Sequence, residues 1–137
     1  MDLHQFVQGQ TPAADPWGQL PQAEAALDAF TEAFNACDLQ RVDQALHFPH
    51  VMLSGSQTLI WQTPGQHPAD FFEQLRSTGW RRTQYEARQA VWLVQDKVHF
   101  VVSYTRRDGD DRILSTHTNM WIVTCQGGRW AVALRSY

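Results

Sequence analysis

Apolar side chains in the first third of the chain recur every three or four residues, the spacing of one face of an α-helix. This pattern predicts a first helix of about 16 residues that begins near Pro21, because the first helical turn tolerates a proline. A second, short helix follows Asp38, whose carboxylate can cap it. The apolar positions are Ala23, Leu27, Phe30, Phe34 and Cys37 in the first helix and Leu39, Val42 and Leu46 in the second.

The pattern then changes to that of strands. Two short strands are predicted at residues 50–54 and 57–63, separated by a Ser-Gly-Ser turn. A third helix begins at Pro68 and ends at Gly79. Beyond it, β-branched and aromatic residues dominate, and short turns rich in Asp and Gly force consecutive strands to pair antiparallel. The long strands predicted there span residues 82–95, 97–106, 113–125 and 129–136.

The order of these elements indicates an α+β fold, with helices covering one face of a single sheet. Long strands coil, and a sheet that coils around a helix makes a cone with a cavity at its open end. Residues 1–20 show little periodicity and are predicted to form an N-terminal arm, followed by a single domain over residues 21–137.

The composition is that of a packed domain. Of 137 residues, 43% are hydrophobic and 18% are charged, which excludes a disordered chain. No apolar run approaches the roughly 20 residues of a membrane-spanning helix, and the N-terminus lacks a signal-peptide pattern. Cys37 and Cys125 cannot form a disulfide framework. We therefore expect a cytoplasmic protein that does not contact membranes.

The charges are distributed unevenly along the chain. The net charge is −3, yet ten of the eleven basic residues lie after residue 75. A basic half can indicate nucleic-acid binding. These bases lie near strand ends and turns, however, where solvated charge is ordinary, and no basic helix or binding motif accompanies them. We therefore expect no nucleic-acid partner.

Strand parity places several chemically useful side chains on common faces. His117, Asn119 and Trp121 share one face of their strand, and Tyr104 belongs to the preceding strand. An imidazole titrates near neutral pH, so His50 and His117 are the candidate catalytic residues. Both histidines also fit purely structural roles, His50 at a turn and His117 within a strand. The candidate cavity-lining residues of these strands are Tyr104, Asn119 and Trp121.

Other kinds of site have weak support in the sequence. His47 and His50 lie three residues apart and His67 follows after a loop, but this spacing does not bring them together, and we expect no metal site. The two cysteines fit the role of small buried hydrophobes. The sequence contains no glycine-rich phosphate loop, nucleophile elbow or pair of catalytic carboxylates, and we expect no cofactor.

Three strings carry a family resemblance: FNACDL at residues 34–39, LHFPHV at 46–51 and GRWAV at 128–132. In these strings and in element order, residues 21–137 resemble the NTF2-like superfamily, which includes SnoaL-like polyketide cyclases, ketosteroid isomerase and limonene epoxide hydrolase. The resemblance implies a homodimer and a cystatin-like cone, with three N-terminal helices packed on a strongly curved, mostly antiparallel six-stranded sheet. HFPHV followed by a glycine turn and Trp61 is similar to an uncharacterised bacterial branch, which implies no reaction.

The resemblance allows one reaction to be tested residue by residue. In ketosteroid isomerase a carboxylate base ends the first strand, and a tyrosine of the first helix donates to the oxyanion. The matching positions here are Ser54 and Phe30. Serine is no free base of suitable pKa and phenylalanine has no proton to donate, so this apparatus is absent. We expect both residues to line the cavity instead. The aspartate–arginine–aspartate set of the epoxide hydrolase has no match either.

Two functional hypotheses follow. The first is a small-molecule pocket protein without a cofactor, a SnoaL-like lyase, isomerase or cyclase that uses histidine acid–base catalysis. The second is a non-catalytic ligand-binding or dimeric assembly module. The expected partners are a second copy of the chain and a small apolar or aromatic ligand. A fold by itself names no substrate.

Overall fold

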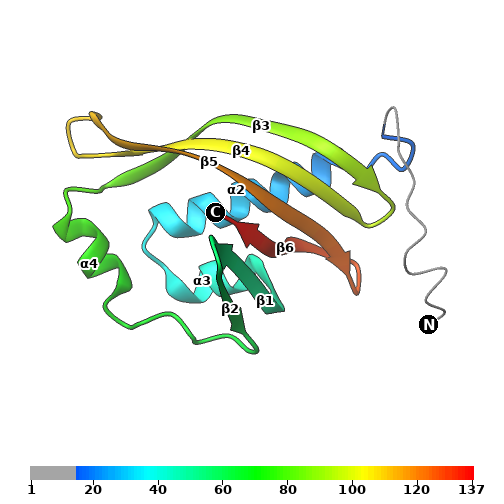
Figure 1. Cartoon of the computed structure of the whole chain (residues 1–137), viewed down its shortest axis with the longest axis horizontal. Coiled ribbons are helices and arrows are strands. Elements are labelled where there is room, and N and C mark those ends of the chain that lie inside the picture. Colours follow the sequence, from blue (N-terminus) through cyan, green and yellow to red (C-terminus); the bar gives the residue numbers. More distant parts are fainter. Residues whose placement is uncertain (1–14) are drawn as a thin grey trace.

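A computed structural model describes residues 15–137, so most of the predicted N-terminal arm lies outside the described residues. Within them, no helix is long and apolar enough to cross a membrane. The elements follow the predicted order (Figure 1). Their bounds are α2 Leu20–Asn35, α3 Leu39–Gln44, β1 Leu46–Ser54, β2 Gln57–Trp61, α4 Phe71–Ser77, β3 Arg82–Val94, β4 Lys97–Arg107, β5 Ile113–Gln126 and β6 Arg129–Ser136.

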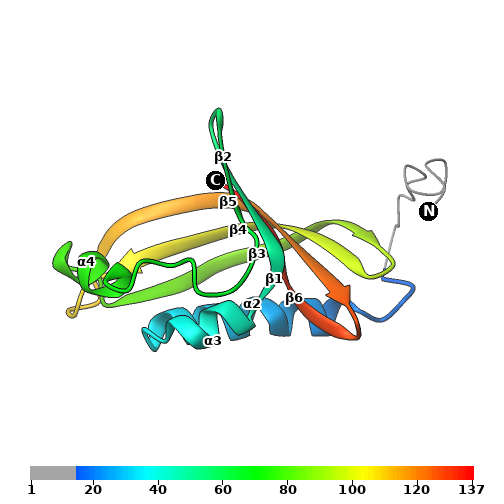
Figure 2. The same cartoon turned by 90° about the horizontal axis from the view of Figure 1, so that it is seen from below.

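The strands of residues 15–137 form one six-stranded sheet in the order β2-β1-β6-β5-β4-β3. β1 pairs parallel with β6, and the other neighbouring strands pair antiparallel. The predicted α+β class and the antiparallel meander of the last four strands are confirmed. The predicted placement of all three helices at the N-terminus differs slightly, because α4 lies between β2 and β3. Figure 2 shows the long strands bending over α2 while the β1–β2 hairpin stands across them.

The core lies between α2 and the concave face of the sheet. On β4 alternate residues are buried, as the period of a strand with one covered face requires. α2 contributes an apolar stripe, and each large side chain buried in this way stabilises the fold by roughly 1.5–3 kcal/mol. The buried residues of the stripe are Ala23, Ala26, Leu27, Phe30, Ala33 and Phe34.

Two carboxamide side chains fasten α2 to β3, one at each end of the helix. Before the helix, Gln19 Nε2 donates to the Val94 carbonyl at 2.5 Å, and its Oε1 accepts from the Asp96 amide at 2.9 Å. At the other end, Asn35 Nδ2 donates to the Thr83 carbonyl and Oδ1 accepts from the Thr83 amide, both at 2.8 Å. The helix axis is therefore fixed along the whole length of β3.

β1 begins earlier than the sequence predicted, at Leu46 rather than His50. The Val132 amide donates to the Ala45 carbonyl at 3.0 Å, which joins the chain to β6 before the expected start. The pairing with β6 is interrupted between Leu46 and Val51. The interruption contains Pro49, which has no amide hydrogen to donate to a neighbouring strand.

The Asn35 bridge gives a prediction about stability. Replacing Asn35 with alanine leaves the Thr83 amide and carbonyl without their partners in a partly buried position. We expect the free energy of unfolding to fall by about 1–3 kcal/mol. Urea denaturation followed by circular dichroism measures this change. Glu32→Ala, an exposed position of the same helix, is the matched control. Equal losses in the two variants would show that the bridge does not stabilise the helix.

Candidate functional site

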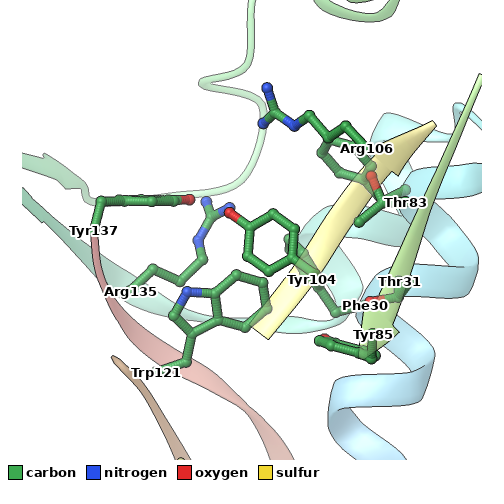
Figure 3. Close-up of a pocket in the computed structure, with 10 residues that line it drawn as sticks. Phe30, Thr31, Thr83, Tyr85, Tyr104, Arg106, Trp121, Arg135 and Tyr137 are labelled. Carbon is green, nitrogen blue, oxygen red and sulfur yellow. The ribbon is translucent and has the colours of Figure 1, made fainter. Parts of the chain in front are cut away.

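A small cavity opens between α2 and the concave face of the sheet, with a volume of about 30 Å³ (Figure 3). That volume holds one or two water molecules. Two arginines, Arg106 and Arg135, supply the charged groups of its lining, and no carboxylate side chain belongs to it. The remainder of the wall is mainly aromatic and consists largely of Phe30, Phe34, Tyr85, Tyr104, Trp121 and Tyr137.

The β4–β5 register brings together most of the cluster expected from the sequence. Tyr104 pairs with His117 across the two strands, and their rings stack with centroids 5.0 Å apart. Asn119 Nδ2 donates to the Tyr104 hydroxyl at 2.7 Å. The ring of Trp121 lies 5.8 Å from that of Tyr104 and packs edge-on against Phe30 at 5.2 Å. Phe30, Tyr104 and Trp121 line the cavity. Asn119 and His117 do not line it, but both contact Tyr104.

His117 lies partly exposed beside this cluster. Its Nε2 forms a 2.8 Å hydrogen bond with the Ser115 hydroxyl. Partial burial, and to a smaller extent the positive charge of Arg106, lower the pKa of His117. The imidazole is therefore mainly neutral at physiological pH. The structure does not test its predicted role in proton transfer, which stays a prediction.

His50 lies apart from His117, fully buried on β1. Its Nδ1 bonds the Val132 carbonyl at 3.2 Å, and its Nε2 accepts from Arg135 Nε at 3.0 Å. Burial first, and then the neighbouring Arg135 charge, lower the pKa of His50 to about 3. His50 is thus a neutral imidazole, and both of its ring nitrogens have partners inside the protein. Its predicted catalytic role also stays untested.

Ser54 is exposed at the end of β1, beside the turn into β2. It lines a shallow surface groove together with Met52, Thr58 and Leu59. Ser54 is not among the residues that line the aromatic cavity, but its groove adjoins the cavity at Tyr137, which lines both. The predicted role of Ser54 in lining the ligand site therefore stays a prediction.

Arg135 and Arg106 are the charged residues of the cavity, and neither was predicted from the sequence; the other lining residues not predicted are Thr31, Phe34, Thr83, Tyr85 and Tyr137. Only 6% of Arg135 is exposed, and its guanidinium carbon lies 5.1 Å from the centre of the Phe30 ring. It comes from β6, opposite Trp121 of β5. One signal in the sequence was available: Arg135 is the single charged residue in the stretch WAVALRS.

Two donors at the cavity have no hydrogen-bond partner among residues 15–137. They are the indole Nε1 of Trp121, a residue that is 4% exposed, and the buried Nε of Arg106. Buried donors are nearly always paired in folded proteins, by protein groups, water or a ligand. Asp15, Asp43, His67 and His99 each have one such buried atom elsewhere in residues 15–137, but among the residues that line this cavity the two unpaired groups are both N–H donors.

The other described histidines lie in separate places, and Nε2 of His99 is buried without a hydrogen-bond partner among residues 15–137. His47 Nε2 lies 3.0 Å from the carbonyls of Thr124 and Arg129. His67 Nδ1 lies 3.3 Å from a carboxylate oxygen of Asp43. In the described part of the chain no three histidine, cysteine or acidic side chains gather as metal ligands would.

Comparisons with known proteins agree with this geometry. The structure superposes on a cystatin-like protein of unknown function from Nostoc punctiforme with a TM-score of 0.67, at 11% identity, over 85% of this chain and 86% of the other. An NTF2-like protein from Cytophaga hutchinsonii gives 0.64, at 15% identity, over 87% and 96%. The chain has the NTF2-like fold.

A third NTF2-like neighbour is a ketosteroid isomerase-like protein from Erwinia carotovora, with a TM-score of 0.57 at 17% identity over 88% of this chain and 95% of the other. No family model matches the sequence, and neither does any curated protein. At these identities the likeness establishes the NTF2-like fold and leaves the chemistry to the residues of the site.

The buried His50 makes the stability of this NTF2-like chain depend on pH. In the folded state its pKa is about 3, and in the unfolded state it returns to about 6.5. Between these values the unfolded state binds more protons, so stability falls as the pH is lowered, by up to about 1.4 kcal/mol per pH unit for this group. Above pH 6.5 its contribution is constant.

We expect His50→Gln, which keeps an acceptor for Arg135, to flatten this dependence. Urea unfolding of both proteins between pH 7 and pH 4 measures the two slopes. The variant retains the smaller contributions of His47, His67 and His99, whose pKa values burial also lowers. An unchanged slope would mean that His50 already binds a proton in the folded protein.

Proposed function

We propose that the cavity under α2 binds a small, largely apolar or aromatic molecule. The observation that carries this proposal is the pair of buried donors without partners, Trp121 Nε1 and Arg106 Nε, in a wall of aromatic rings. Leaving such a donor unpaired costs about 1–3 kcal/mol. An apolar pocket with a few converging polar groups is the usual form of a small-molecule site.

The size of the cavity limits what enters it. A volume of about 30 Å³ accepts one small functional group rather than a whole ring system. The remainder of the ligand therefore lies at the mouth, against Tyr137. That residue is 47% exposed, so its ring can turn aside as a ligand enters.

Two kinds of function remain proposals for this pocket. The catalytic one is a cofactor-free lyase, isomerase or cyclase in which His117 moves a proton, and it is supported by the contact between His117 and Tyr104 on the cavity wall. The alternative is a non-catalytic ligand-binding or assembly module, supported by the engagement of both nitrogens of His50. A cytoplasmic location belongs to either proposal.

The indole N–H resonance of Trp121 tests the binding proposal. We expect compounds from a panel of small aromatic molecules, neutral and charged, to shift this resonance in ¹⁵N-edited NMR spectra, because the indole gains a hydrogen-bond partner. Trp121→Phe assigns the signal. The indole resonance of Trp130, which lies near the start of β6 and does not line the cavity, is the internal control. A panel that leaves the Trp121 signal in place would contradict the proposal.

A bound compound from that panel then separates the catalytic proposal from the alternative. If His117 moves a proton, His117→Gln will bind the compound with similar affinity but lose its conversion, followed by NMR over time. If the wild-type protein converts no bound compound, and His117→Gln changes only the thermal melting point, the non-catalytic module is favoured.

We also propose a homodimer through the convex face of the sheet. Met120 is exposed there on β5, and two more large apolar side chains, Val91 and Leu114, are exposed where the registers of β3 and β5 shift. Exposed apolar groups gathered on one face are typical of protein contacts. We expect sedimentation to give the mass of two chains at micromolar concentration, and Met120→Asp to give the mass of one. Gln40→Asp, an exposed change on α3, is the control. A wild-type monomer would contradict the dimer.

A further inference from the structure

We infer that the ligand of the cavity carries a carboxylate, and that Arg135 is the residue that binds it. This inference rests on the proposed binding function and adds to it the chemical class of the ligand. Its support lies in the charges around the cavity, in the neutral partners of Arg135 and in the directions of the remaining donors.

Arg135 is a buried cation without an acidic partner. Among residues 15–137 no carboxylate oxygen lies within 4.0 Å of its guanidinium, and the cavity lining contains no aspartate or glutamate side chain. Three other strand arginines differ in this respect. Arg82 pairs with Asp111, Arg88 with Asp28 and Arg107 with Glu86. Buried charges in proteins are normally paired, so an unpaired one points to a partner outside the chain.

The groups that do contact Arg135 are neutral. Its Nε donates to His50 Nε2 at 3.0 Å, and Nη2 contacts the Met52 sulfur at 3.2 Å. The guanidinium also faces the ring of Phe30. Because burial keeps the pKa of His50 far below neutral, His50 holds the arginine without adding charge of its own. The positive charge therefore remains available to a ligand.

Two tyrosine hydroxyls lie beside the guanidinium of Arg135, whereas the guanidinium of Arg106 extends away from it (Figure 3). In Figure 3 the hydroxyl ends of Tyr104 and Tyr137 and the guanidinium of Arg135 point toward one another. The guanidinium carbon lies 5.9 Å from the centre of the Tyr137 ring. Trp121 Nε1 and Arg106 Nε add two unpaired N–H groups. A site built from donors and cations fits a carboxylate, whose two oxygens accept several hydrogen bonds, and disfavours a cation.

His50 is in this account a positioning residue. An arginine side chain has many rotamers, and binding loses free energy when it must be ordered first. The His50 bond to Nε fixes the plane of the guanidinium and leaves Nη1 without a partner among the described residues. A carboxylate at position 50 would keep the hydrogen bond but neutralise the charge. Substitutions at position 50 can therefore test separately the orientation of the Arg135 guanidinium and its positive charge.

The first test compares two probes of nearly the same shape, sodium phenylacetate and phenylacetamide, in which an anionic carboxylate is replaced by a neutral carboxamide. Titrated into the wild-type protein at neutral pH, phenylacetate is expected to shift the Trp121 indole resonance and to bind at least about tenfold more tightly than the amide, the difference made by one charged hydrogen-bonding pair. Equal or tighter binding of the amide overturns the carboxylate inference and leaves the proposed binding function standing. No shift with either probe overturns the inference, and no shift across the whole aromatic panel overturns the binding function as well.

The second test uses variants of the two residues. Arg135→Gln is expected to weaken phenylacetate binding at least about tenfold and to leave the amide nearly unchanged. Arg112→Gln, an exposed arginine in the turn before β5, is the matched control and should bind both probes like wild type. If Arg135→Gln does not fold, the comparison of probes in the wild-type protein and the His50→Glu variant described next still decide the question.

The positioning role of His50 is tested by the preference for phenylacetate over the amide. His50→Gln, which offers an acceptor near the position of Nε2, is expected to keep the preference for phenylacetate over the amide. His50→Glu is expected to abolish it, because the glutamate pairs with Arg135. Circular dichroism checks that both variants are folded. If both folded variants retain the wild-type preference, Arg135 does not bind the carboxylate in the way inferred.

Discussion

The position of α2 in the concave sheet is the constraint on which the site depends. Gln19 and Asn35 bind the backbone of β3 at the two ends of the helix, each through a donor and an acceptor of one carboxamide. These bonds attach both ends of the helix to β3 and to the turn that follows it, and Phe30 of the helix meets Trp121 edge-on at 5.2 Å. The cavity is the space that remains between this contact and the open end of the sheet.

Much of the fold was predictable because it depends on local chemistry. The period of apolar residues identified α2, and the short turns containing Asp96 and Gly109 required antiparallel neighbours. Once β4 and β5 are adjacent, alternation alone places Tyr104, His117 and Trp121 on one face, as the structure has them. Each of these inferences uses only residues that are near in sequence or joined by a short turn.

The missed parts of the site depend on contacts between distant segments. β1 pairs parallel with β6, and no short turn joins these two strands to determine their register. The bond between His50 and Arg135, 85 residues apart, follows from that pairing and from no local pattern. Ser54 also depends on such contacts: it lines a groove that adjoins the cavity at Tyr137, a neighbour that no local pattern in the sequence indicates.

The unpaired charge of Arg135 opposes stability, and this is what makes it informative. The charge adds to the effect of burial in lowering the pKa of His50, and it also acts to lower the pKa of His67, where Asp43 acts in the opposite direction. A glutamate in place of His50 would relieve that cost, because an ion pair would replace a cation held by a neutral ring. The arrangement of Arg135 and His50 is thus less stable than a simple alternative, and it lies at the wall of a cavity with two further unpaired donors. This is the pattern expected where binding rather than folding determines the choice of residues. At Arg135 the stability of the isolated chain therefore favours neutralising the charge, whereas complementarity to an anion favours keeping it.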